Sequence, residues 1–255
     1  MAIQEFLGTR QVFTSAEFAR TFPDSQTDRN LLSRAVRRGG VDRVRRGLYV
    51  SKTGQFSNSE ASPLDIAAAV APDAIFAFTS ALQLHGVLHN LTNLTQFFTA
   101  EHLSPFSYRG QDYLAHRIGL TAPTSQTLLT ASGKAYRATT REQTLVDCLA
   151  KPRSTGGLEN LLRSLGGLTH IDAGEVARLA EATSLSTKAR LGWVLETRRQ
   201  AWRIDDAILS DLRAMIDTGP SYFWSSTPRK DHHWVNAWKL YLPEPEEEMA
   251  SWLNE

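Results

Sequence analysis

The chain has 255 residues, of which 42% are hydrophobic, and its formal net charge at pH 7 is +1. This length allows one large domain or two modest ones, and we expect two, each with its own core. A single cysteine excludes a disulfide framework, and we expect Cys148 to be a buried thiol. The opening residues lack the basic segment followed by an apolar one that is typical of a signal peptide. The most apolar stretch is broken at Pro72, well short of the roughly 18 residues of a membrane span. We therefore expect a cytoplasmic protein with no membrane association.

Positive charge is concentrated at the start of the chain. The first 52 residues contain ten Lys and Arg against five Asp and Glu, whereas the remainder contains eighteen against twenty-two. A basic block on a small module is the electrostatic feature of a nucleic-acid-binding domain. The alternative is a charged face that only meets solvent.

The basic segment opens with a short predicted helix. Thr14 and Ser15 form a capping pair, and Phe18 and Phe22 follow four residues apart, as on one face of a helix. The helix should end before Pro23, because proline cannot continue it.

A longer basic helix is predicted next. It should begin at a cap formed by Thr27 or Asp28 and end at Gly39, with Leu32 and Val36 facing the core. Hydrogen-bonding side chains lie on the opposite face at helical spacing: Asn30, Ser33, Arg34 and Arg37. In the major groove of DNA, arginine can pair with guanine through two hydrogen bonds, and asparagine can do so with adenine.

Residues 41–50 predict a β-hairpin with a tight turn at Arg45, Arg46 and Gly47, in which glycine can take a positive φ. Helices followed by a basic-tipped hairpin are the elements of a winged helix-turn-helix, whose last helix enters the major groove and whose wing meets backbone or minor groove. The alternatives are a solvated face and a wing that contacts protein. We expect the DNA contacts to come from Arg29, Asn30, Ser33, Arg34, Arg37, Arg38, Arg43, Arg45 and Arg46.

Residues 51–62 are rich in Ser, Gly and Asn without an apolar period, which is typical of a linker. We therefore expect a DNA-binding domain at 1–54 and a larger domain at 62–255, with little core shared between them. The larger domain is predicted to be α+β and to end in a helical series. Its predicted helices are 63–71, 79–86 (capped by Thr79 and ended by Gly86), 139–152, 158–165, 172–182, 187–202 and 205–216, and its predicted strands are 94–100, 112–118, 134–139 and 232–242.

Patterns for catalysis and metal binding are weak. His232 and His233 would point to opposite faces of a strand, and no third ligand has useful spacing. His85 and His89 fit partly buried histidines. Asp147 could act as a general base, but a helix-packing carboxylate paired with arginine is the favoured interpretation. We expect no catalytic residues, metal or cofactor, and an enzyme tethered to DNA is a third alternative.

A second basic feature is predicted on the helix at 187–202. A solvent-exposed face is the favoured interpretation, and a surface for a polyanion or a partner is the alternative. The residues are Lys188, Arg190, Arg198, Arg199 and Arg203.

Several stretches resemble the AbiEi-type antitoxins of type IV toxin-antitoxin systems. "VFTSAEFA" and "LLSRAVRRGGVDRVRRGLYV" resemble the winged helix-turn-helix at the N-terminus of that family, and "SALQLHGVL" resembles its helix ending in His-Gly. "TTREQTLVDCLAKPRSTGGLENLL" resembles its T-x-x-R-T-L-v-D motif followed by Gly-Gly, and "ARLGWVLE" its RLGxLLE motif. The resemblance covers most of the chain and becomes weaker after Trp202. Gln143 stands where the family has arginine, and it can instead serve as a helix cap after Thr140.

The resemblance implies an antitoxin of abortive infection, a form of phage defence. Such a protein represses its own operon by binding double-stranded operator DNA, expected to hold inverted repeats. It also neutralises a co-encoded nucleotidyltransferase-like toxin, and no stable complex is required. The helix with Lys188 and Arg190 is where we expect the surface that counters the toxin. The alternative is a ligand-sensing winged-helix regulator without a toxin, which an apolar pocket with convergent polar groups in the larger domain would favour.

Overall fold

The computed structural model describes residues 3–23, 25–216, 219–224 and 232–255, without the side chains of residues 25–29. Contacts group the chain into two units, Met1–Ala74 with Asn93–Arg117, and Ile75–Thr92 with Ile118–Glu255. This grouping differs from the expected boundary between residues 54 and 62, because a later segment of the chain packs with the N-terminal one. Which parts fold independently stays a prediction.

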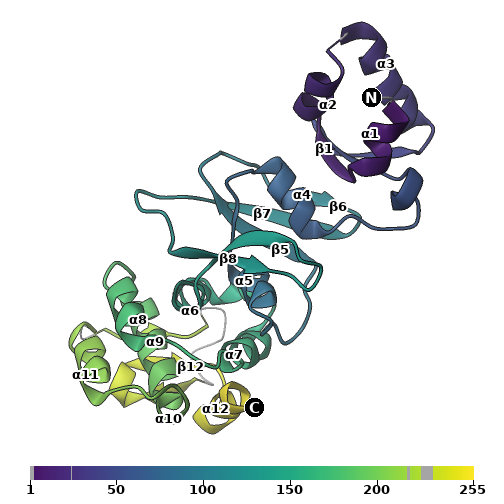
Figure 1. Ribbon diagram of the computed structural model, residues 1–255. Coiled ribbons are helices and arrows are strands. Elements are labelled where there is room, and N and C mark those ends of the chain that lie inside the picture. The colour runs from purple at the N-terminus through teal and green to yellow at the C-terminus, as the bar shows by residue number, and fades with distance from the viewer. Residues whose placement is uncertain (1–2, 24, 217–218, 225–231) are drawn as a thin grey trace. The chain divides into compact units, whose positions relative to one another are not determined.

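The first unit begins with three helices and a small antiparallel sheet, drawn in purple in Figure 1. The strands are ordered β1-β3-β2, and Phe13 faces Tyr49 in the first pair. The elements are α1 (Ile3–Thr9), β1 (Val12–Thr14), α2 (Ser15–Thr21), α3 (Ser25–Arg37), β2 (Val41–Arg45) and β3 (Leu48–Ser51).

The ends of these elements follow from local chemistry. Thr14 and Glu17 form a reciprocal capping box at the start of α2, so the predicted cap is confirmed. Gly39 and Gly47 have φ of +74° and +82°, which ends α3 and closes the β2–β3 turn as predicted. The predicted cap of the basic helix at Thr27 or Asp28 is wrong, because α3 already begins at Ser25.

Aromatic rings build the core of this part. Phe6 lies edge-on to Phe13 and Phe18, with ring centroids 5.2 and 5.6 Å apart. Phe13 in turn stacks on Tyr49. Such edge and stacked pairs are the favoured aromatic geometries, so α1, α2 and the sheet are held together by one cluster.

The first unit also contains a helix and three strands from farther along the chain. Strands β5 and β7 are parallel, and β6 pairs antiparallel with β7. Asp73 accepts hydrogen bonds from the Thr99 hydroxyl and the Ala100 backbone N–H, which ties the end of β5. The elements are the 3₁₀ turn η1 (Gly54–Phe56), α4 (Pro63–Val70), β5 (Leu94–Thr99), β6 (Phe106–Tyr108) and β7 (Gln111–Arg117).

The second unit combines two short groups of paired strands with a series of helices, and the fold class is α+β as predicted. Strand β9 pairs with β4 and β8, and β12 lies between β10 and β11. Helices α7 to α12 gather around β12 in the green and yellow part of Figure 1. The strands are β4 (Ile75–Phe76), β8 (Ser125–Leu129), β9 (Ala135–Thr139), β10 (Ser221–Tyr222), β11 (His233–Val235) and β12 (Leu240–Leu242). The helices are α5 (Phe78–Leu84), α6 (Arg141–Ala150), α7 (Leu158–Gly166), α8 (Ala173–Ala180), α9 (Leu185–Thr197), α10 (Arg199–Trp202), α11 (Asp206–Ala214) and α12 (Glu246–Asn254), with 3₁₀ turns at Pro152–Thr155 and Asn236–Trp238.

Three local predictions for this unit are corrected. Helix α5 is capped by Ala77 rather than Thr79, although a left-handed Gly86 does follow its end. The helix expected at 187–202 is two helices, because the chain leaves the α-helical conformation at Arg198. Gln143 does not complete a capping box, since its side chain bonds to Thr124 N and Asp147 instead. None of the helices in the described ranges combines the length and apolarity of a membrane span.

Candidate DNA-binding surface

Helix α3 presents its polar stripe to solvent. Asn30, Ser33, Arg34 and Arg37 are exposed, and Leu32 on the other face is buried in the aromatic cluster. Their common face follows from helical spacing, so the helix orients these four side chains as the sequence indicates. Arg38, just past the end of α3, is also exposed, while the side chain of Arg29 lies outside the described part of the chain.

The hairpin β2–β3, hereafter the wing, adds fewer free arginines than expected. Arg43 and Arg46 are exposed, but Arg45 is half-buried and its guanidinium carbon lies 5.0 Å from the centroid of the Phe106 ring. A β-bulge between Arg43 and Arg45 changes the direction of the strand there. Arg45 therefore packs against β6, and Arg43 and Arg46 are the wing arginines that face solvent.

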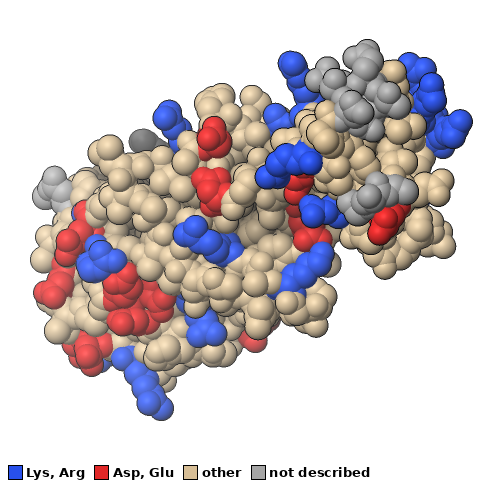
Figure 2. All heavy atoms as spheres, turned by 45° about the horizontal axis from the view of Figure 1, so that its top comes forward, with Lys and Arg blue, Asp and Glu red and all other residues tan. Residues whose placement is uncertain are grey.

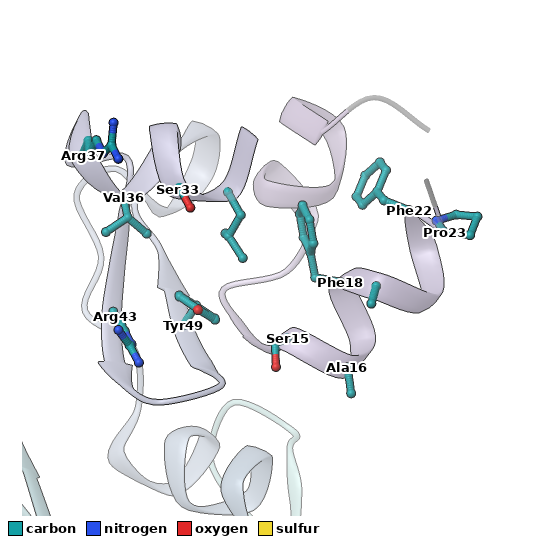
Figure 3. Close-up of a pocket in the computed structure, with 12 residues that line it drawn as sticks. Ser15, Ala16, Phe18, Phe22, Pro23, Ser33, Val36, Arg37, Arg43 and Tyr49 are labelled. Carbon is teal, nitrogen blue, oxygen red and sulfur yellow. The ribbon is translucent and has the colours of Figure 1, made fainter. Parts of the chain in front are cut away.

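A groove of about 780 Å³ separates α2 from α3 and the sheet. Its floor is apolar, with Phe18, Leu32 and Tyr49 among its lining residues. Arg37 and Arg43 come from α3 and β2 and lie on the same side of the groove (Figure 3). The end of the helix and the following strand thus bring these two arginines to one edge, where they extend the basic stripe of α3 onto the wing.

The exposed arginines of this surface are available to a partner. Within the described ranges, no hydrogen bond or ion pair joins the side chains of Arg34, Arg37, Arg38, Arg43 or Arg46 to another residue. At the upper right of Figure 2, blue side chains gather at the edge of the N-terminal part. A basic surface of this kind attracts polyanions by releasing counterions when it binds them.

Among the side chains that the structure describes, Asp42 is an acid close to this basic surface, and it is neutralised. Asp42 on β2 accepts hydrogen bonds from Tyr108 and Arg109, and Lys52 lies 3.4 Å away. Burial acts to raise the pKa of Asp42, but the bond from Tyr108 and the charges of Lys52 and Arg109 outweigh it and hold the pKa below its ordinary value. Asp42 is therefore ionised and already paired with cations.

Comparison with known families identifies a central segment of the chain. Residues 74–197 match the family described as the AbiEi antitoxin C-terminal domain. This segment belongs to the AbiEi antitoxin family. The resemblance is therefore confirmed for this segment, and we refer to residues 74–197 as the AbiEi domain. No curated protein matches the chain.

The fold is shared with a solved structure. The chain is similar to the RV2827C protein from Mycobacterium tuberculosis, with a TM-score of 0.72 and 17% sequence identity. The alignment covers 98% of this chain and 92% of the mycobacterial one. At this level of identity the similarity concerns the fold, and it extends well beyond the AbiEi domain at both ends.

The predicted basic face at the end of the AbiEi domain does not form. Arg190 is buried, and its guanidinium donates hydrogen bonds to the carbonyls of Leu149 and Tyr222. Burial lowers the pKa of Arg190 to about 10, which still leaves it charged at neutral pH. Arg198 is half-buried and donates to the Gly166 carbonyl. These two arginines therefore hold backbone segments together.

The other three residues of that set are separate from one another. Lys188 is half-buried on α9, Arg199 on α10 pairs with Asp206, and Arg203 is exposed in a left-handed conformation after α10. A partner surface formed by all five is excluded, because Arg190 has no exposed guanidinium to offer. A role for Lys188, Arg199 or Arg203 stays a prediction.

Titratable groups in the AbiEi domain have structural partners. His85 lies 2.9 Å from the Thr139 carbonyl through Nε2, and burial lowers its pKa. Asp147 accepts a hydrogen bond from Gln143, and burial raises its pKa to about 7. In the described ranges, no three His, Cys, Asp or Glu side chains lie close enough together to hold a metal ion.

Three residues that sequence analysis did not single out border the candidate surface: Phe106, Tyr108 and Arg109. They lie on β6 and on the turn that joins it to β7. The one signal in the sequence was Arg109-Gly110 between two β-prone runs, which is typical of a two-residue hairpin turn. Their contacts with the wing connect residues more than sixty positions apart and leave no local pattern.

Proposed function

We propose that the chain is an antitoxin that binds double-stranded operator DNA through a winged helix-turn-helix at its N-terminus and neutralises a co-encoded nucleotidyltransferase-like toxin. The antitoxin role rests on the AbiEi domain. DNA binding rests on one observation, the set of exposed, unpaired arginines that α3 and the wing bring to one surface. By analogy with winged helices, α3 enters the major groove and the wing meets the phosphate backbone.

The recognition helix is tested by replacing Arg34 or Arg37 with alanine. Each change should cost about 1–3 kcal/mol of binding free energy on the operator and less on random DNA, because a base contact is lost rather than a phosphate contact. A competition assay between the two duplexes measures the difference. An equal loss on both would assign that arginine to the phosphate backbone.

The wing is tested by the salt dependence of binding. Arg46→Ala should lower the slope of log affinity against log salt by about 0.9, the value for one phosphate contact. Arg45→Ala should leave the slope unchanged, because its guanidinium packs on Phe106. Equal changes in slope for both variants would place Arg45 on the DNA as well.

Toxin neutralisation is tested with the full chain expressed from a foreign promoter beside the neighbouring toxin gene. A variant with Arg34, Arg37 and Arg46 replaced by alanine should lose operator binding but still restore growth, because its AbiEi domain is unchanged. Loss of growth with a folded variant would mean that the basic surface takes part in neutralisation. Failure of the unchanged chain to protect cells would favour the ligand-sensing regulator.

A further inference from the structure

The wing is tied to the β6–β7 hairpin by a group of contacts that we call the wing latch: Asp42 and Arg45 on β2, and Phe106, Tyr108 and Arg109 on the hairpin. Asp42 Oδ2 accepts a hydrogen bond from Tyr108 Oη at 2.9 Å. The same oxygen accepts bonds from Arg109 Nε and Nη2 at 3.1 and 2.8 Å. Arg109 also lies 3.5 Å from Glu60, so its guanidinium is engaged on two sides.

The second half of the latch is an arginine on an aromatic ring. The Arg45 guanidinium lies over Phe106, and Phe106 stacks on Tyr113 with ring centroids 4.5 Å apart and planes at 1°. Tyr113 is 2% exposed. The ring that receives Arg45 is thus fixed on a buried neighbour, and a cation held over a fixed ring is restricted in turn.

The turn of the hairpin is shaped to present Arg109. Tyr108 pairs with Gln111, which leaves Arg109 and Gly110 as a two-residue turn with φ of +49° and +77°. Glycine, asparagine and aspartate are the residues usual at such positions, and another residue there is held by its surroundings. The ion pair of Arg109 with Asp42 is the interaction that holds it.

We infer that Phe106, Tyr108 and Arg109 are positioning residues for DNA binding, which act through Asp42 and Arg45 and do not touch DNA. Two anchors on β2 fix the direction of the wing and hence the place of Arg46 relative to α3. They also neutralise Asp42, the only acid between residues 29 and 52, whose charge would otherwise repel phosphate. This inference rests on the proposed DNA binding.

The wing latch connects the N-terminal residues, which are proposed to bind DNA, with a segment of the AbiEi domain, which is proposed to neutralise the toxin. Segment 93–117 lies within the stretch that matches the AbiEi domain, yet its contacts group it with the N-terminal residues. The AbiEi domain therefore contributes the hairpin that sets the wing.

The test measures binding of the full-length protein, by fluorescence anisotropy across a salt series, to the duplex upstream of its own coding region and to a random duplex. Arg109→Ala and Phe106→Ala should each weaken binding to the upstream duplex about fivefold to tenfold with an unchanged salt slope, because a loosened wing still brings Arg46 to its phosphate in the complex and only the cost of ordering the wing rises. Arg109→Lys should recover only part of the loss, because lysine keeps the charge but not the two-pronged bond. Tyr108→Phe removes one hydroxyl and serves as the variant least prone to misfold.

Two further variants serve as controls. Arg46→Ala should lower the salt slope, and Arg178→Ala, which removes an exposed arginine paired with Glu175 in the AbiEi domain, should change nothing. Unchanged affinity in the latch variants, or a loss with a lower slope, overturns the inference, since the hairpin would then be either irrelevant or itself a phosphate contact. Absence of binding by the unchanged protein rejects the proposed DNA binding instead, and the inference with it.

Discussion

Replacing Gly192 with alanine is expected to destabilise the second unit strongly. A Cβ atom at this position in α9 would lie 2.0 to 2.5 Å from three atoms of the Trp238 ring, closer than any real contact. Trp238 is fully buried, its indole N–H donates to Glu196, and Arg213 lies over its ring. The indole cannot easily retreat, so the cost should reach about 3 kcal/mol, the upper part of the range for overpacked cores.

The measurement for Gly192 is the free energy of unfolding in urea. Gly8→Ala is the matched control, because Gly8 also lies in a helix and a Cβ there meets nothing within 4 Å. That variant should be neutral or slightly stabilising. In the double variant with Trp238→Phe the two penalties should not add, since the smaller ring makes room for the methyl group. Strict additivity would show that the ring is not what excludes a side chain at Gly192.

Asp147 is expected to make stability fall as pH rises toward neutrality. Its Oδ2 atom is buried without a hydrogen-bond partner in the described part of the chain, while Oδ1 accepts a bond from Gln143. Burial raises its pKa to about 7, although Gln143 and the charge of Lys151 act in the opposite direction. The unfolded chain loses this proton near pH 4 and the folded chain keeps it to about pH 7, so its stabilising contribution is complete below pH 4 and is lost as pH approaches 7.

The difference in the free energy of unfolding between the Asp147→Asn variant and the unchanged protein, followed across pH, measures this effect. The substitution should stabilise the protein by about 2–3 kcal/mol more at pH 8 than at pH 5, because asparagine carries no charge to bury. Gln143→Arg should flatten the same profile, since a guanidinium in place of the Gln143 amide would pair with the carboxylate and lower its pKa. If the free energy of unfolding changed by the same amount between pH 5 and pH 8 in all three proteins, the Asp147 carboxyl would have to be in contact with water.

The sequence predicted elements well where a local signal was strong. The cap at Thr14, the left-handed glycines and the apolar spacing of α3 are each set by neighbours within a few residues. The same holds for the polar stripe of α3, because helical spacing alone determines which of its side chains share a face. The apolar spacing did not predict the break at Arg198. Helices α9 and α10 continue the same apolar stripe, so the break between them hardly changes the spacing of apolar residues in the sequence.

What could not be predicted depends on long-range packing. Arg190 looks like a surface residue in the sequence, but its hydrogen bonds go to carbonyls 41 and 32 residues away. Arg45 looks like a free wing residue, but Phe106 lies beneath it. Strands β4 and β6 have two and three residues, too few for an alternating pattern to be visible.

The route of the chain between the two units constrains how such a protein can be recombined. Because the chain passes between the units after Ala74, Thr92 and Arg117, the N-terminal unit is not one continuous stretch of sequence. A hybrid that received only residues 1–62 from a relative with other DNA specificity would keep Tyr108 and Arg109 from the old protein, facing a wing they did not evolve with. Exchange of specificity between relatives should therefore require two gene segments to move together, and a natural hybrid that changed one alone should carry compensating substitutions in the other.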